Sequence, residues 1–150
     1  ISFLRDLTNK TPDVKFDIYG IDKVQPIWAD HYFKTISNAK MGLNLSRGEA
    51  IKYYSSDRIT QIVGNGLVCL IDEKTKYRNF FNENEMVFYR NTNDLSEKIL
   101  KISSDDKLRK KIAKNGKIKY MKFFNSDLVS KYIIDKTLDI KSKDKYLWQK

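Results

Sequence analysis

The chain has 150 residues, of which 41% are hydrophobic and 13% aromatic, and its 29 Lys and Arg against 19 Asp and Glu give a formal net charge of +10. This length and apolar content suffice for one folded domain and exclude a wholly disordered chain. The longest uninterrupted apolar run covers residues 67–71. It is far shorter than the ~20 residues of a membrane-spanning helix, so no segment of this sequence predicts one.

In the first half of the chain, the spacing of apolar residues alternates between that of strands and that of helices. Residues 15–20 are expected to form a strand that ends at a turn glycine, and residues 27–40 a helix with an apolar stripe. Residues 41–46 follow as a strand. The cap-type residues 55–57 then precede a helix that ends in a Gly-Asn-Gly turn, and residues 67–72 form the next strand. These elements predict a strand–helix–strand unit.

The second half is dominated by helical spacing. A short helical segment over residues 74–81 leads to a strand over residues 85–90. A helix is expected from Asp94 to about Ile102, and residues 104–106 are expected to cap the next one. The last expected helix covers residues 126–138.

Together these elements predict an α/β fold in which helices cover a parallel sheet. Because there is no internal repeat and no linker rich in Gly, Ser or Pro, we expect one domain over residues 1–140 and a polar basic tail over residues 141–150. The sequence opens at Ile1, within what resembles the middle of an amphipathic helix. We therefore expect it to be a piece of a longer protein.

Cysteine and histidine are too scarce for several classes of site. Cys69 is the one cysteine and lies in the apolar run, which favours a buried thiol and excludes an internal disulfide or a Cys-based zinc cage. His31 is the one histidine, so any His-centred metal site or catalytic triad would have to be built around it. No metal site is expected.

The loop over residues 46–58 is the richest in functional groups. Open α/β sheets bind ligands beyond the carboxyl ends of their strands, where this loop lies. A helix start with free backbone N–H groups favours a phosphate, and a guanidinium can add a bidentate contact. No Gly-rich nucleotide fingerprint is present, so a polar surface loop is the alternative. The candidate binding residues are Ser46, Arg47, Gly48, Tyr53, Ser55, Ser56, Asp57 and Arg58.

Three segments, residues 37–48, 53–59 and 64–67, resemble the bacterial "glycosyl transferases group 1" family, in the carboxy-terminal, donor-binding half of its GT-B enzymes. The pattern of Asp94-Leu95, of Asp106 with Arg109, and of Ile112-Ala113-x-x-Gly116 is similar to the end of that half. The resemblance covers about residues 15–138. It implies a Rossmann-like domain, with helices on both faces of the sheet and further carboxy-terminal helices.

The resemblance also implies an activity, the hexosyl-type transfer of a sugar from a nucleotide-sugar, whose diphosphate would lie near residues 55–58. Gln61 occupies the position of the family's ribose-binding Glu, and Tyr53 that of the first Glu of its Glu-x7-Glu pattern. A glutamine amide can still bond ribose hydroxyls. With no Asp-x-Asp in the sequence, the resemblance implies neither metal nor cofactor beyond the nucleotide-sugar substrate.

In GT-B enzymes an amino-terminal domain supplies most of the acceptor site, so this chain alone is expected to be inactive. His31 is a candidate base for the acceptor hydroxyl, and no catalytic residue is assigned. The resemblance implies surface or envelope polysaccharide synthesis, in the cytoplasm or at the inner face of the membrane.

The charge distribution keeps other functions open. Residues 101–150 carry 15 basic and 6 acidic side chains, against 14 and 13 in residues 1–100. One alternative is a basic module that binds nucleic acid or an anionic membrane without catalysis. Nucleic acid is disfavoured because no RRM, KH or helix-turn-helix signature is present. A regulatory flavodoxin-like domain is the third hypothesis, although no acidic cluster follows the first expected strand.

Overall fold

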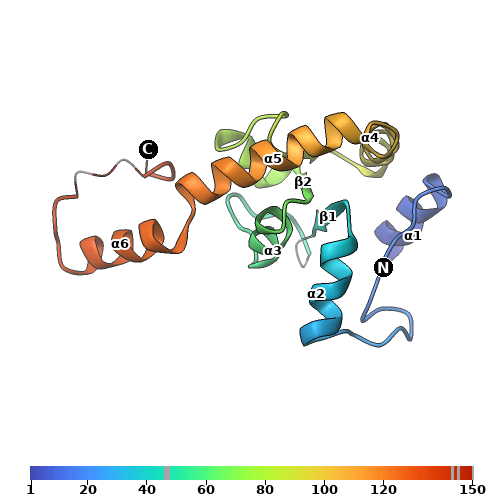
Figure 1. Cartoon of the computed structure of the whole chain (residues 1–150), viewed down its shortest axis with the longest axis horizontal. Coiled ribbons are helices and arrows are strands. Elements are labelled where there is room, and N and C mark those ends of the chain that lie inside the picture. The colour runs from blue at the N-terminus through green and yellow to red at the C-terminus, as the bar shows by residue number, and fades with distance from the viewer. Residues whose placement is uncertain (46–47, 143, 145, 150) are drawn as a thin grey trace.

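The computed structural model describes residues 1–45, 48–142, 144 and 146–149 (Figure 1). Its elements, in chain order, are α1 (Ser2–Lys10), α2 (Ala29–Asn38), β1 (Met41–Asn44), α3 (Arg58–Gly64), β2 (Val68–Asp72), the 3₁₀ turns η1 (Glu73–Thr75) and η2 (Tyr77–Asn79), β3 (Val87–Tyr89), α4 (Thr92–Ser104), α5 (Asp106–Phe123) and α6 (Ser126–Thr137).

The strands form one parallel sheet in the order β1-β2-β3. In its register Gly42 lies opposite Cys69, and Leu70 lies opposite Val87. Parallel pairing requires a crossover between successive strands, and α3 forms the one between β1 and β2. The predicted α/β class, with a Rossmann-like parallel sheet, is confirmed.

Helices cover both faces of this sheet. Val68 and Leu70 of β2 pack with α1 and α4, whereas Cys69 and Ile71 pack with α3. Successive strand residues point to opposite faces, which explains why all four are buried. In Figure 1, α4 lies above the strands and α3 lies below them. The long helix α5 contributes to both hydrophobic clusters, through Ile112 to the first and Tyr120 to the second.

Two glycines allow backbones to approach closely. A Cβ on Gly42 would lie 2.5 Å from Cγ1 of Ile62, so α3 packs directly on β1. A Cβ on Gly116 would lie 2.2 Å from the carbonyl oxygen of Glu85, so α5 packs on the turn before β3. The contact at Gly42 fixes the position of α3, whose first turn carries candidate binding residues.

The expected strand over residues 15–20 is wrong. Residues 15–19 have no regular secondary structure, and a turn follows in which the Gly20 N–H bonds the Val24 carbonyl at 3.0 Å. Val14 and Phe16 nevertheless pack against the first hydrophobic cluster. The apolar spacing is therefore satisfied by side chains alone, without backbone pairing to β1. The helical segment expected over residues 74–81 is two short 3₁₀ turns, separated by Lys76 with φ 60°.

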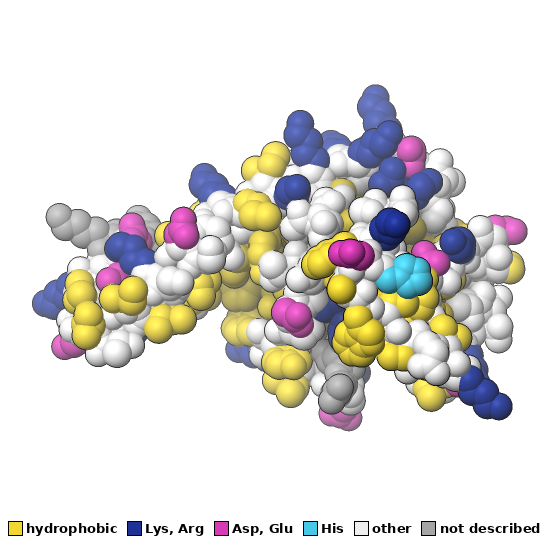
Figure 2. Space-filling view, turned by 60° about the horizontal axis from the view of Figure 1, so that its bottom comes forward, with side chains coloured by type: hydrophobic (Ala, Val, Ile, Leu, Met, Phe, Trp, Pro, Cys, Tyr) yellow, Lys and Arg dark blue, Asp and Glu magenta, His cyan; other side chains and the backbone are white. Residues whose placement is uncertain are grey.

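The carboxy-terminal part extends from the sheet through α6. Trp148 packs against the rings of Phe124, Tyr132 and Tyr146, with centroid distances of 5.6, 5.6 and 5.3 Å. Of these rings Tyr146 is buried, so the last residues carry an aromatic anchor as well as polar groups. Figure 2 shows hydrophobic side chains on the lobe at its left end, where α6 lies. In the described part of the chain, every helix is too short or too polar to span a bilayer.

Candidate functional site

The loop between β1 and α3 is tied to the carboxyl end of β1 by side-chain hydrogen bonds. The side-chain amide of Asn44, the last residue of β1, donates to Oγ of Ser55 at 3.2 Å. The Arg58 guanidinium donates to the Leu45 carbonyl. Asn44 Oδ1 is buried and, among the described residues, has no hydrogen-bond partner. The loop therefore lies at the sheet edge where the sequence predicts ligand binding.

Ser56 accepts hydrogen bonds from the first two backbone N–H groups of α3. Its Oγ accepts from the Arg58 N–H at 3.3 Å, and its carbonyl accepts from the Ile59 N–H at 3.2 Å. Asp57, at the N-cap position, makes no capping hydrogen bond with its side chain. The predicted cap is thus supplied by Ser56, and an anion would depend on the Arg58 guanidinium more than on these two amides.

A pocket of about 330 Å³ lies between the first turns of α2 and α3. Asp57, Arg58 and Gln61 line one side, so the structure brings together three of the predicted binding residues. The other lining residues precede or begin α2: Ile27, Trp28, Ala29 and Tyr32. The pocket combines a cation, an anion, a side-chain amide and aromatic rings.

Tyr53 lies away from this pocket. Its N–H donates to the Thr75 carbonyl at 2.8 Å, and its hydroxyl accepts from Nδ2 of Asn79 at 2.5 Å. Its ring centroid is 4.9 Å from that of Phe80. Tyr53 therefore holds the loop against η1 and η2, a role that differs from the ribose contact that the resemblance implies for its position.

Of the four remaining predicted residues, the structure describes Ser55 and Gly48. Ser55 is hydrogen-bonded to Asn44 and donates to the Ser56 carbonyl at 3.1 Å, so it shapes the loop. Gly48 is exposed with φ 73°, a left-handed conformation that favours glycine. Ser46 and Arg47 lie outside the described residues.

Trp28 and Tyr32 line the pocket although the sequence analysis did not select them. Trp28 immediately precedes α2, and its side chain is 75% exposed. Its place at the start of the helix expected over residues 27–40, just after the first expected strand, was a signal, because such segments border the carboxyl edge of α/β sheets. His31 is exposed in the first turn of α2 and is not among the lining residues.

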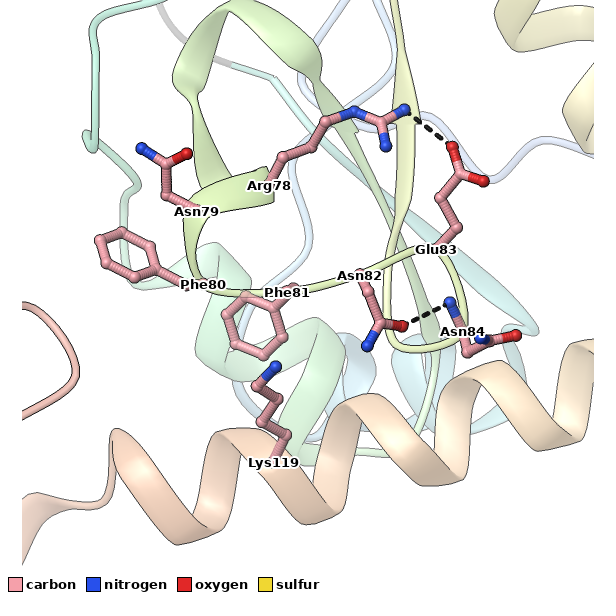
Figure 3. A pocket seen from close by; sticks show the side chains of 8 residues that line it. All are labelled: Arg78, Asn79, Phe80, Phe81, Asn82, Glu83, Asn84 and Lys119. Carbon is pink, nitrogen blue, oxygen red and sulfur yellow. Dashed lines mark hydrogen bonds and ion pairs between the residues drawn. The ribbon is translucent and has the colours of Figure 1, made fainter.

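A larger concavity of about 640 Å³ lies elsewhere, between the turn that precedes β3 and α5 (Figure 3). Its two cations are paired within the chain: Arg78 with Glu73 and Glu83, both at 2.9 Å, and Lys119 with Glu85 at 2.8 Å. None of the predicted binding residues lines it. Because its charges are already compensated, we favour the smaller pocket as the functional site.

Other chemistries have little support in the described part of the chain. Burial raises the pKa of the Cys69 thiol to about 12, so this cysteine stays protonated and is a poor nucleophile. Burial also raises the pKa of Tyr77, although a hydrogen bond with Ser55 acts in the opposite direction. Within the described residues, no group of three His, Cys, Asp or Glu side chains could hold a metal ion.

Comparison with known proteins gives one match. The model of a protein family described as "Glycosyl transferase-like" matches residues 1–135. No curated protein and no solved structure matches the chain significantly. The matched region includes the whole sheet and both walls of the smaller pocket.

Proposed function

Because the chain belongs to the glycosyl transferase-like family, we propose that it is the donor-binding half of a GT-B glycosyltransferase and binds a nucleotide-sugar in the pocket between α2 and α3. The observation that carries this proposal is the meeting of Arg58, Gln61 and Asp57 at one pocket beside the carboxyl edge of the sheet. Each of these groups suits one part of the ligand.

Arg58 is suited to the diphosphate. A guanidinium has more N–H donors than the one it gives to the Leu45 carbonyl, and it binds phosphate oxygens in a bidentate manner. Gln61 and Asp57 are suited to ribose, since an amide can donate and accept and a carboxylate accepts from hydroxyls. A volume of about 330 Å³ is at the lower end of the ~300–1,000 Å³ usual for ligand pockets. The pocket would thus hold only part of the donor.

The chemistry follows from this placement. In sugar transfer the bond between the anomeric carbon and the diphosphate oxygen breaks, a bond to the acceptor oxygen forms, and the acceptor hydroxyl loses its proton. Negative charge grows on the departing diphosphate, and a guanidinium fixed beside it stabilises that charge. Loss of one such donor typically lowers kcat by about 10²–10³-fold. The proposal uses no metal ion or cofactor.

We further propose that the acceptor site and the catalytic base come from a domain outside this sequence. In this arrangement the chain binds donor but does not transfer sugar by itself. Polysaccharide synthesis in a bacterial cytoplasm is the setting that we propose for the complete enzyme.

Affinity measurements with matched variants test the binding proposal. Titration with UDP-, GDP- and ADP-sugars should give saturable binding to at least one of them. Arg58→Ala should weaken it by about 10- to 150-fold, the equivalent of one hydrogen bond to a charged group, and Arg58→Lys by less. Arg78→Ala, in the larger concavity, is the control and should leave affinity unchanged. No binding at millimolar ligand, or a stronger effect of the control, would overturn the proposal.

A peripheral contact with an anionic membrane is a second proposal, carried by the exposed side of α5. Six exposed lysines occupy this side, together with the exposed Ile118 and Met121. Figure 2 shows Lys and Arg side chains gathered at the top of that view. Each lysine near an anionic surface contributes about 1 kcal/mol. The lysines are Lys107, Lys110, Lys111, Lys114, Lys117 and Lys122.

Vesicle sedimentation tests this contact. Binding should require anionic lipid and decrease with salt, and alanine at Lys110, Lys114 and Lys117 should weaken it. Alanine at three other exposed lysines, Lys15, Lys23 and Lys74, is the control of equal charge. Binding of RNA without binding of lipid would favour the nucleic-acid alternative instead.

A further inference from the structure

The two tryptophans of this chain have opposite environments. Trp148 is packed among three aromatic rings. Trp28 is 75% exposed, more than any other large hydrophobic side chain in the described part of the chain, and packs in no aromatic pair there. An indole left in water at the edge of a pocket forgoes the stabilisation that burial would give it. Its exposure is explained if a ligand covers it.

The walls of this pocket differ in chemistry. Ile27, Trp28 and Tyr32 form an apolar and aromatic side, and Arg58, Asp57 and Gln61 form a polar side. A nucleotide has the same division, because its base presents a flat π surface while its ribose and phosphates present hydroxyls and charge. With Arg58 and Gln61 engaged by phosphate and ribose, the base would extend toward the aromatic side.

The backbone around Trp28 is held in place. Trp28 is extended, with φ −136° and ψ 165°, and its carbonyl accepts from the N–H groups of His31 and Tyr32 at 3.1 and 3.3 Å. The next residue, Ala29, has φ 45°, a left-handed conformation that L-residues rarely adopt. Trp28 is therefore joined to the first turn of α2 by two backbone hydrogen bonds, and a backbone held in this way loses less entropy when a ring stacks on the indole.

We infer that the indole of Trp28 is the surface on which the base of the nucleotide donor stacks. This inference rests on the proposed donor site and names a specificity residue within it. Every base has a π face, so stacking on Trp28 supports all bases about equally. It therefore selects nucleotides over pyrophosphate and sugar phosphates, and the choice between bases falls to other groups.

The test compares ligands with and without a base. For a nucleoside diphosphate, Trp28→Ala should weaken affinity by about 5- to 150-fold, and Trp28→Phe should retain most of it. Neither variant should change the affinity for inorganic pyrophosphate, which Arg58→Ala should weaken. Phe33→Ala is the matched control, since Phe33 is an exposed aromatic residue of α2, the helix that Trp28 immediately precedes, and does not line the pocket.

Fluorescence gives a second measurement that does not depend on affinity. In a Trp148→Phe variant all indole emission comes from Trp28, and saturation with a nucleoside diphosphate should quench it whereas pyrophosphate should not. If the diphosphate binds but Trp28→Ala binds it equally well, or emission is unchanged at saturation, the stacking inference is wrong and the donor site stands. If the unmodified protein binds no nucleoside diphosphate, the donor site and the inference both fail.

Discussion

A pair of glycine-to-alanine substitutions tests how the helices are packed. Gly116 lies in α5 and Gly64 at the end of α3, and both belong to helices. Alanine is favoured over glycine in a helix by up to about 1 kcal/mol. At Gly64 the new Cβ would meet only Cε of Met121, at 3.7 Å, an ordinary contact with a flexible side chain. Gly64→Ala should therefore leave stability unchanged or raise it by up to about 1 kcal/mol.

At Gly116 the same helical gain is opposed by a clash. The Cβ would lie 2.2 Å from the Glu85 carbonyl oxygen, whereas ordinary contacts begin at 3.4 Å. The backbones of α5 and of the turn before β3 must therefore separate by the difference of 1.2 Å. The turn cannot easily yield, because Lys119 pairs with Glu85 at 2.8 Å and the Asn115 amide donates to the Asn84 carbonyl at 3.2 Å. Overpacking of this kind destabilises by about 1–3 kcal/mol.

Urea unfolding followed by circular dichroism measures both variants. With about 1–3 kcal/mol per molar for the urea dependence of a small protein, a loss of about 2 kcal/mol lowers the midpoint by on the order of 1 M. Gly116→Ala should unfold at a lower urea concentration than the unmodified protein, and Gly64→Ala at an equal or higher one. If Gly116→Ala is as stable as Gly64→Ala, the close approach of α5 to the turn before β3 is refuted.

Three further predictions concern other parts of the fold. Gly42→Ala would place a Cβ within 2.9 Å of three atoms of Ile62, so it should lower the free energy of unfolding by about 1–3 kcal/mol. In a chain that already carries Ile62→Ala, adding Gly42→Ala should lower the free energy of unfolding by less. A double-mutant cycle from urea unfolding measures this coupling. Because burial raises the pKa of the Cys69 thiol to about 12, Cys69 should resist alkylation at pH 8 in the folded protein and react fully in denaturant. Mass spectrometry measures the labelling, and rapid labelling of the folded protein would contradict the burial of Cys69. Burial alone would raise the pKa of Asp94, but hydrogen bonds from Lys98 and the Arg90 N–H outweigh it, so the pKa is lowered below the ~3.9 of an unfolded aspartate. Asp94 therefore stabilises the fold above about pH 3.9, and this contribution is lost as the pH falls through the lower pKa of Asp94 in the folded protein. Asp94→Asn should make the free energy of unfolding less dependent on pH on the acid side. An unchanged pH dependence would contradict the ion pair.

Local sequence patterns predicted the elements whose structure depends on local contacts. The Gly-Asn-Gly turn ends α3, and Asp105 caps α5 through a bond from the Leu108 N–H at 2.8 Å. Asn91 caps α4, which begins at Thr92 and not at Asp94, and the Asn91 side chain accepts from the Asp94 N–H at 3.0 Å. Such errors of a few residues arise when two neighbouring polar residues can both serve as caps.

Features that depend on distant residues were not predictable in this way. The apolar spacing of residues 15–20 is that of a strand, but pairing requires a partner edge, and only the folded chain shows that none is used. Tyr53 resembles a ligand contact in sequence, whereas its ring packs on Phe80. Trp28 was overlooked because its exposure beside Arg58 and Gln61 results from the packing of α2 near α3.

A nucleotide-sugar should bind between the first turns of α2 and α3. Amide chemical shifts of the ¹⁵N-labelled protein, followed during titration with nucleotide-sugars, test it most directly. We expect the largest changes on residues 27–32 and 57–61. Changes confined to residues 78–84 and Lys119, which line the larger concavity, or no changes at millimolar ligand, would contradict it.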